Sequence, residues 1–298
     1  MKRSSNRRVE TKSSRTAAFT CLSRAASYKD KRECYAGPDN IAYLLIPAFF
    51  RLLLKSRRLY WLFMRRFIPK GIYEYVIART KYFDAAFIEA LKQGFDQILI
   101  FGAGFDSRAL RFNDLNKGTS ILELDTPLTQ REKVKVYQSK KLAVPKQLVF
   151  VPIDFNKDDL ETVLAQAGFV MGKKSLFMLE GITMYLSQAG IDSTFRFVSK
   201  VSGTGSRVVF DYIYGSVLRK ENRYYGEKDI YKLVANVGEG WTFALEEGEV
   251  ASFLSRYGFV QKDHCGSREL EERYFTNSKG AVVGKLNGTH AIVTGVKC

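Results

Sequence analysis

Short apolar runs recur along the chain from Gly94 onward, and a segment of helix length separates most of them. The first run is Gln97–Phe101, which leads directly into Gly102-Ala103-Gly104. Strands that alternate with helices are typical of βαβ units, in which parallel strands are joined by crossover helices. We therefore expect an α/β fold built on a mostly parallel sheet. The other expected strands are Ser120–Leu124, Leu148–Ile153, Ser175–Leu179, Arg207–Tyr212, Phe259–Lys262 and His290–Val296.

The last two expected strands differ from the others. Only a polar, glycine-containing stretch separates Phe259–Lys262 from His290–Val296, so we expect these two strands to pair antiparallel at one edge of the sheet.

The first 94 residues have a different pattern. Apolar residues recur there at three- and four-residue spacing, which predicts helices. Gly37-Pro38-Asp39 and Pro69-Lys70-Gly71 supply the breaks between them. We expect a disordered basic tail over 1–15, a helical cap over 16–94, and a Rossmann-like domain over 95–298 with a helical insertion at about 213–245. The expected cap helices are Thr16–Tyr28, Ile41–Lys55, Leu59–Phe67 and Ile72–Leu91.

Composition excludes several classes of protein. The 298 residues are 46% hydrophobic, which is enough for a sizeable core and rules out disorder, collagen and a coiled coil. The four cysteines form no CxxC motif, which argues against a zinc knot or a disulfide scaffold. The two histidines are too few for a His-rich metal site. We therefore expect no bound metal. The first twenty residues lack an apolar core typical of signal peptides, which favours a cytoplasmic location.

The positive charge is concentrated in the N-terminal third. The net charge is +16, and residues 1–94 hold 20 Lys and Arg against 7 Asp and Glu. Either an anionic partner or a solvated basic surface explains this asymmetry. In residues 41–67 basic residues interleave with apolar ones. Peripheral membrane contact is one interpretation of that segment, and packing onto the protein itself is the one we prefer. We expect no nucleic-acid partner, because the basic residues lie on expected helices.

Two motifs at the first strands indicate a nucleoside site. The Gly102-x-Gly104 turn lets the backbone approach a ligand closely, although Ser107 stands where a dinucleotide fingerprint has its third glycine. Asp125 ends the second strand about 20 residues later, where a carboxylate accepts hydrogen bonds from both ribose hydroxyls. A plain turn and a helix cap remain the alternatives for these two motifs.

Polar residues at the later strands extend this site. Asp154 follows the third strand and would suit an adenine amino group or a cap. Glu180 follows the fourth strand, where a buried carboxylate needs a partner, and Tyr185 comes five residues later. Arg79 lies among apolar residues of an expected helix, either to hold a carboxylate or to extend to solvent.

Taken in order, the segments SRTAAFTCLSRAASY, the helix of Arg79–Asp84, GAGFDSR, LELD and LEGITMYL resemble the leucine carboxyl methyltransferase family. The likeness runs from about Thr16 to the C-terminus and is strongest to the prokaryotic, polyketide O-methyltransferase-like branch. It implies a class I methyltransferase with a Rossmann-like seven-stranded, mostly parallel sheet, an antiparallel edge strand and a helical N-terminal cap. It also implies S-adenosyl-L-methionine as cofactor and S-adenosyl-L-homocysteine as product.

The resemblance further implies roles for individual residues. Arg79 would meet the methionine carboxylate of the cofactor, and Tyr185 would lie toward the methyl acceptor, so these two are the candidate catalytic residues. The other implied cofactor contacts are Gly102 and Gly104 at the methionine end, Asp125 at the ribose, Asp154 and Phe155 at the adenine, and Glu180 at the amino group.

The expected activity is O-methylation of a carboxylate, or an acidic hydroxyl, on a small molecule or a peptide C-terminus. A carboxylate is ionised at neutral pH and needs no general base, which is consistent with so few histidines. We expect residues 213–241 to form part of the acceptor pocket with the cap.

Two other functions stay open. An NAD(P)-dependent oxidoreductase would explain the glycines and Asp125, but neither Ser107 nor the long N-terminal region. A non-catalytic basic protein that binds membrane or nucleic acid would bind no cofactor.

Overall fold

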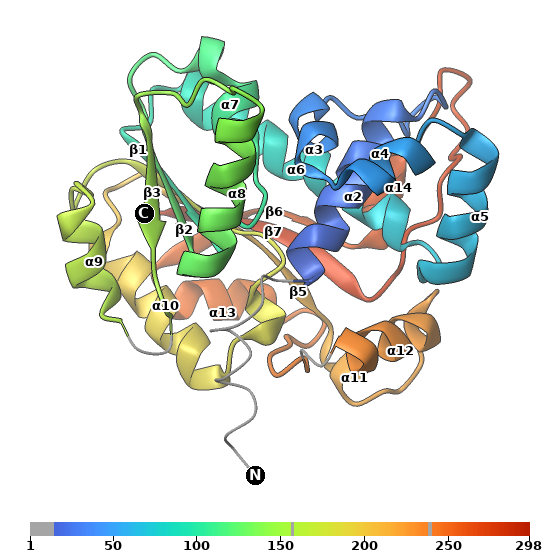
Figure 1. Ribbon diagram of the computed structural model, residues 1–298. Coiled ribbons are helices and arrows are strands. Elements are labelled where there is room, and N and C mark those ends of the chain that lie inside the picture. Colours follow the sequence, from blue (N-terminus) through green and yellow to red (C-terminus); the bar gives the residue numbers. More distant parts are fainter. Residues whose placement is uncertain (1–14, 156–157, 238–239) are drawn as a thin grey trace.

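The computed structural model describes residues 15–155, 158–237 and 240–298 (Figure 1). Nearly all of the predicted basic tail therefore lies outside the described residues. The centre of the fold is a seven-stranded sheet in the order β3-β2-β1-β4-β5-β7-β6. Its strands are β1 (Gln97–Phe101), β2 (Ser120–Asp125), β3 (Leu148–Pro152), β4 (Ser175–Leu179), β5 (Arg207–Ile213), β6 (Phe259–Cys265) and β7 (His290–Lys297).

The predicted mostly parallel sheet is confirmed. Strands β1 to β5 pair in parallel, and β7 runs antiparallel to both β5 and β6. The antiparallel strand thus lies one place in from the edge, and β6 is the edge strand itself. Since β7 is reversed, its first residue, His290, lies opposite Ile213 at the same end of the sheet as the carboxyl ends of the parallel strands.

Helices cover both faces of the sheet because successive strand residues point to opposite faces. Ile98 and Ile100 of β1 pack toward the cap, whereas Leu99 and Phe101 pack on the other face. The helices of the cap face are α2 (Arg15–Lys29), α3 (Asn40–Leu45), α6 (Ile72–Lys92), α8 (Pro127–Ser139) and α14 (Ser267–Tyr274). Those of the other face are α9 (Leu160–Gln166), α10 (Gln188–Val201), α11 (Gly215–Leu218) and α13 (Val250–Arg256).

The remaining elements are short or peripheral. They are α4 (Ala48–Leu53), α5 (Arg57–Phe67), α7 (Arg108–Arg111), η1 (Asn113–Leu115), η2 (Thr183–Tyr185) and α12 (Glu227–Val237). Helices α11 and α12 fall within the stretch expected to form a helical insertion.

The cap is helical, as predicted, but one helix boundary was wrong. The single helix expected over Ile41–Lys55 is two helices, α3 and α4, because Pro47 interrupts it. Ile46 before the proline is extended, with ψ at 151°, since a proline disfavours helical backbone at the residue before it. Within the described chain, no helix is both long and apolar enough to cross a bilayer.

Candidate active site

The carboxyl ends of β1 and β2 bring the predicted glycines and Asp125 together. Gly102 and Gly104 both have positive φ, at +62° and +51°, which glycine adopts at little cost. The Gly104 N–H donates to the Asp125 carboxylate at 2.5 Å, and the Thr126 N–H donates to its other oxygen at 2.6 Å. Burial raises the pKa of Asp125. No Lys or Arg in the described part of the chain forms an ion pair with it, so it suits neutral hydroxyl donors.

The residues predicted for adenine lie beside Asp125. The Ile153 N–H donates to the Asp125 carbonyl at 2.9 Å, which fixes the segment after β3 against the end of β2. The Phe155 ring stacks on Phe101, the last residue of β1, with ring centroids 6.3 Å apart. Asp154, which lies between Ile153 and Phe155 in the sequence, is half-buried. The three strand ends thus form one continuous edge.

Ser107, the departure from the dinucleotide fingerprint, has a structural role. Its buried hydroxyl donates to Asp39 of the cap at 2.8 Å and accepts from Arg111 at 2.9 Å. The helix that follows, α7, has only four residues. Here the chain connects the glycine loop to the cap instead of beginning a long helix.

Arg79 lies between two carboxylates, on the cap side of the strand ends. Its Nε is 3.0 Å from Glu180, and its Nη1 donates to Asp211 of β5 at 2.9 Å. Asp211 also accepts from the Tyr75 hydroxyl at 2.8 Å and from the Gly181 N–H at 2.6 Å. Asp211 was not among the predicted site residues. The argument applied to Glu180, that a carboxylate in an apolar strand needs a partner, would have found it.

These ion pairs belong to a larger buried network. Arg108, which is fully buried, contacts Glu180, Asp84 and Asp106. Burial opposes ionisation of Asp106, but Arg108 holds its pKa down at about 2. The members are Arg24, Arg79, Arg108, Arg111, Asp39, Asp84, Asp106, Glu180 and Asp211.

Four arginines and five carboxylates give this network a formal charge of −1. A ligand with net positive charge is therefore favoured at its open side.

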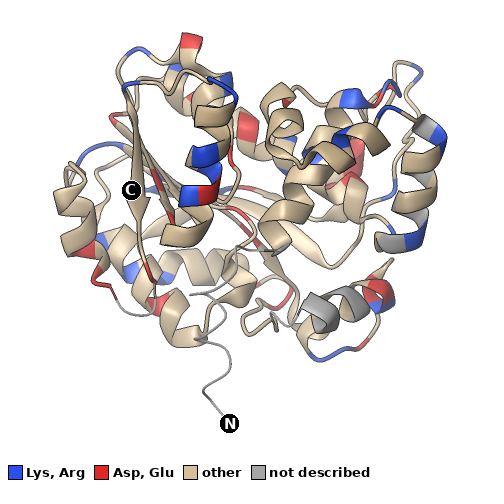
Figure 2. Ribbon diagram, in the orientation of Figure 1, with Lys and Arg blue, Asp and Glu red and all other residues tan. Residues whose placement is uncertain are grey.

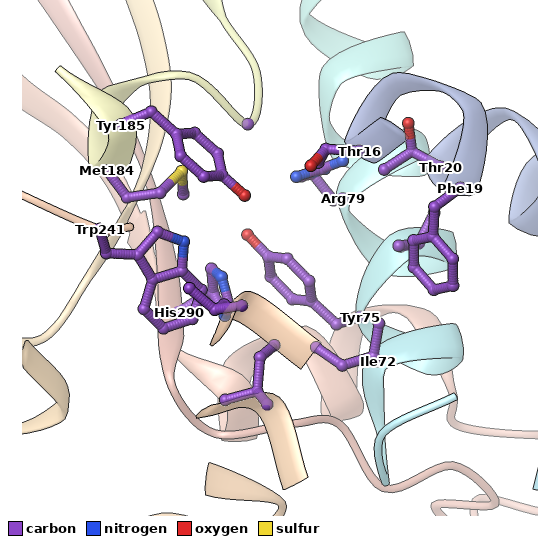
Figure 3. Close-up of a pocket in the computed structure, with 14 residues that line it drawn as sticks. Thr16, Phe19, Thr20, Ile72, Tyr75, Arg79, Met184, Tyr185, Trp241 and His290 are labelled. Carbon is purple, nitrogen blue, oxygen red and sulfur yellow. The ribbon is translucent and has the colours of Figure 1, made fainter. Parts of the chain in front are cut away.

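A cavity of about 230 Å³ opens beside Arg79 (Figure 3). Arg79 and Tyr75, both on α6, point into it from one side, and the hydroxyl of Tyr185 points into it from the other. Among the described residues, nothing accepts a hydrogen bond from Nη2 of Arg79. The apolar part of the wall comes from three places. The cap contributes Phe19, Ile72 and Val76, η2 contributes Met184, and the 213–241 segment contributes Ile230, Val234 and Trp241.

His290 contributes a hydrogen-bond acceptor to the cavity. The Thr289 hydroxyl donates to Asn287 at 2.5 Å, so its oxygen accepts from Nδ1 of His290 at 2.7 Å. This arrangement assigns the proton to Nδ1 and leaves the lone pair on Nε2. Burial, together with the charge of Arg79, lowers the pKa of His290 to about 3, so the ring is neutral.

Two aromatic side chains hold the imidazole in place. Tyr75 stacks on His290 at 4.5 Å, and Trp241 meets it edge-on at 5.5 Å. The indole Nε1 is buried and donates to no residue in the described part of the chain. His290 was not among the predicted site residues, because two histidines are too few for a His-rich metal site. Its place at the start of the last expected strand was the one sequence signal for it.

Comparison with known proteins agrees with this geometry. The model of the leucine carboxyl methyltransferase family matches residues 18–199, more than half of the chain. A Bacillus subtilis protein named as an S-adenosyl-L-methionine-dependent methyltransferase is 27% identical over 203 residues, covering 68% of this chain and 66% of that protein. A Mycolicibacterium paratuberculosis protein of the same name is 30% identical over 186 residues, which cover 62% of this chain and 59% of that protein. The matches thus span less than two thirds of these relatives.

Solved structures support the fold. A DUF574 family protein from Streptomyces avermitilis superposes with a TM-score of 0.60 at 12% identity, covering 98% of this chain and all of that chain. A structure from Thermobifida fusca, described as that of a methyltransferase, superposes with a TM-score of 0.56 at 14% identity, with 94% of each chain covered. The glycine loop and the carboxylates Asp125 and Glu180 lie at strand ends within residues 18–199, the range that the family model matches. The chain therefore belongs to the leucine carboxyl methyltransferase family.

Proposed function

We propose that this protein is an S-adenosyl-L-methionine-dependent O-methyltransferase acting on a carboxylate or an acidic hydroxyl. The observation that carries the proposal is the position of Arg79. It belongs to the ionic network at the strand ends and also lines the cavity. A cofactor held at the strand ends would therefore meet an acceptor held in the cavity. The names of the curated relatives support the cofactor, and family membership disfavours the oxidoreductase alternative.

The residues at the strand ends fit this cofactor. Asp125 offers buried carboxylate oxygens for ribose hydroxyls, and Phe155 offers a ring face for adenine. Nη2 of Arg79 would bind the methionine carboxylate, and Glu180 would face the amino group. The net charge of the network matches a ligand that carries one excess positive charge. When bound, the cofactor supplies a sulfonium-activated methyl group, whose bond to sulfur breaks as the bond to oxygen forms.

The cavity would orient the acceptor and keep water out. Its apolar walls suit a small aromatic or aliphatic acceptor, or the end of a peptide of similar size. Tyr185, the predicted catalytic tyrosine, points into this space and would contact the acceptor. A carboxylate acceptor carries no proton that must leave. Catalysis then depends mainly on proximity and orientation.

His290 favours the acidic-hydroxyl version of the proposal. Its Nε2 lone pair would accept a hydrogen bond from an acceptor hydroxyl, and the Trp241 indole N–H would donate to the same group. The hydroxyl proton would move onto Nε2 as the oxygen–methyl bond forms, and it would pass to solvent when the product leaves. A carboxylate would gain only the second of these bonds. The His290→Phe variant should therefore lose turnover of phenols more than turnover of carboxylic acids.

The test is incubation of the purified protein with S-adenosyl-L-methionine and a panel of aromatic carboxylic acids, phenols and peptides with free C-termini. Mass spectrometry detects the methylated product and S-adenosyl-L-homocysteine. Asp125→Ala should abolish turnover, whereas Asp114→Ala, an exposed carboxylate on η1, should not. Turnover by Asp125→Ala at the wild-type rate would contradict the ribose assignment. Cofactor binding without methylation of any acceptor would contradict the acceptor class.

A further inference from the structure

The segment between α3 and α6 carries basic residues and no acidic ones. From Asn40 to Tyr73 the sequence contains no Asp or Glu. The helix α5 lies at the outer margin of the molecule, and basic residues mark it in Figure 2. Lys55 and Arg58 are exposed. The seven basic residues are Arg51, Lys55, Arg57, Arg58, Arg65, Arg66 and Lys70.

The same segment exposes large apolar side chains. On α4, Phe49 is 69% exposed and Leu52 is 64% exposed; on α5, Leu59 is 57% exposed and Leu62 is 68% exposed. Each pair is three residues apart, so its two members lie on one side of their helix. Single exposed apolar residues are common, but four within 14 residues are a concentration of the kind that marks an interaction site.

These side chains are not needed to hold the helices in place. Other residues of the two helices and the turn between them do so: Leu54 and Tyr60 are buried, and the rings of Phe50 and Phe63 meet at 6.0 Å and pack against the core. The segment therefore has an inner apolar side that explains its folding. On its outer apolar side, Phe49 meets the ring of its neighbour Phe50 at 5.5 Å, yet all four side chains stay more than half exposed.

We propose that the outer surface of α4 and α5 docks the protein onto a bilayer that contains anionic lipid. Exposed Phe and Leu would enter the interface between headgroups and acyl chains, while Lys and Arg would meet the lipid phosphates and carboxylates. A second copy of the chain fits less well, because a symmetric contact would place arginine against arginine. A nucleic acid would match the charge, but it would leave Leu59 and Leu62 without an apolar partner.

The experiment is flotation of the full chain with vesicles of phosphatidylcholine alone or with about 30% phosphatidylserine. The wild type should bind the anionic vesicles, and added salt should weaken the binding. Lys55→Gln with Arg58→Gln should lower the partition coefficient about 30-fold, since each cation near an anionic surface contributes about 1 kcal/mol. Leu59→Ser with Leu62→Ser keeps the charge and should weaken binding about tenfold or more.

Matched controls separate this surface from general effects. Lys135→Gln with Lys140→Gln removes two exposed charges from α8 and its end, and Val282→Ser with Val283→Ser removes two exposed valines elsewhere. Both should bind like the wild type, and circular dichroism should show that every variant is folded.

Three results would overturn the proposal. The first is no binding of the wild type to anionic vesicles, and the second is unchanged binding by Leu59→Ser with Leu62→Ser. The third is that a fluorescent oligonucleotide, or a second copy of the chain, binds at this surface while vesicles do not.

Discussion

Replacing Asp211 with asparagine removes one charge from the ionic network while keeping the side chain's size. Asp211 is fully buried and accepts three hydrogen bonds, from Tyr75, Arg79 and Gly181. Asparagine has a single acceptor oxygen, so its amide N–H₂ must face at least one of these donors. Removing one partner of a buried ion pair costs about 3–5 kcal/mol. Because Glu180 still pairs with Arg79, we expect a loss near the lower end, about 3 kcal/mol.

Urea unfolding followed by circular dichroism measures this change in the free energy of unfolding. The control is Asp263→Asn, whose ion pair with Arg273 is partly exposed to solvent and should contribute less than about 1 kcal/mol. Asp211→Asn should also weaken cofactor binding, because Arg79 would lose one of its two anchors. Asp211→Asn as stable as Asp263→Asn would refute the view that this network holds the site together.

Three further changes test other buried polar groups. Arg79→Ala should weaken S-adenosyl-L-methionine binding in calorimetry more than any single change in residues 1–15, and an equal loss on deleting that tail would count against it. His290 has a pKa of about 3 when folded and an ordinary value near 6.5 when unfolded, so the unfolded chain binds the extra proton between these values. Urea unfolding gives the free energy of unfolding of the wild type minus that of His290→Gln. This difference should rise by about 2 kcal/mol from pH 5 to pH 7.5, and a difference that does not change with pH would contradict the prediction. Glu123 of β2 and Lys133 of α8 form a separate buried ion pair at 2.5 Å. Burial raises the pKa of Glu123 to about 7 despite this contact. Lys133→Met should therefore lower the free energy of unfolding more at pH 8.5 than at pH 6, because at pH 6 the carboxyl of Glu123 can stay protonated without its partner. An equal loss at both pH values would show that the ion pair is unimportant for stability.

Local patterning was enough to predict most of the fold. The strands Gln97–Phe101 and Ser175–Leu179 have the predicted bounds, because apolar runs between polar or glycine-rich segments have clear ends. The place of β7 between β5 and β6 could not be read from the sequence, since strand order depends on contacts between distant segments. The break at Pro47 was visible in the sequence but was not applied to the predicted helix boundary.

The candidate site was predicted where motifs lie next to strand ends. Gly102, Gly104, Asp125 and Glu180 lie at the strand ends as expected. The need of Asp211 for a partner could have been inferred from its apolar strand, but not the partner itself, because Arg79 lies 132 residues away. His290 was missed because Tyr75 and Trp241, which place its ring in the cavity, are also far away in the sequence. Such pairs become visible only when the cap is placed on the sheet.

The decisive experiment on cofactor binding is calorimetric titration with S-adenosyl-L-methionine, with NADH in a parallel cell. We expect the wild type to bind S-adenosyl-L-methionine and not NADH, and Asp125→Ala to lose binding with an unchanged circular dichroism spectrum. Binding of NADH alone would contradict it and would make the protein an oxidoreductase candidate.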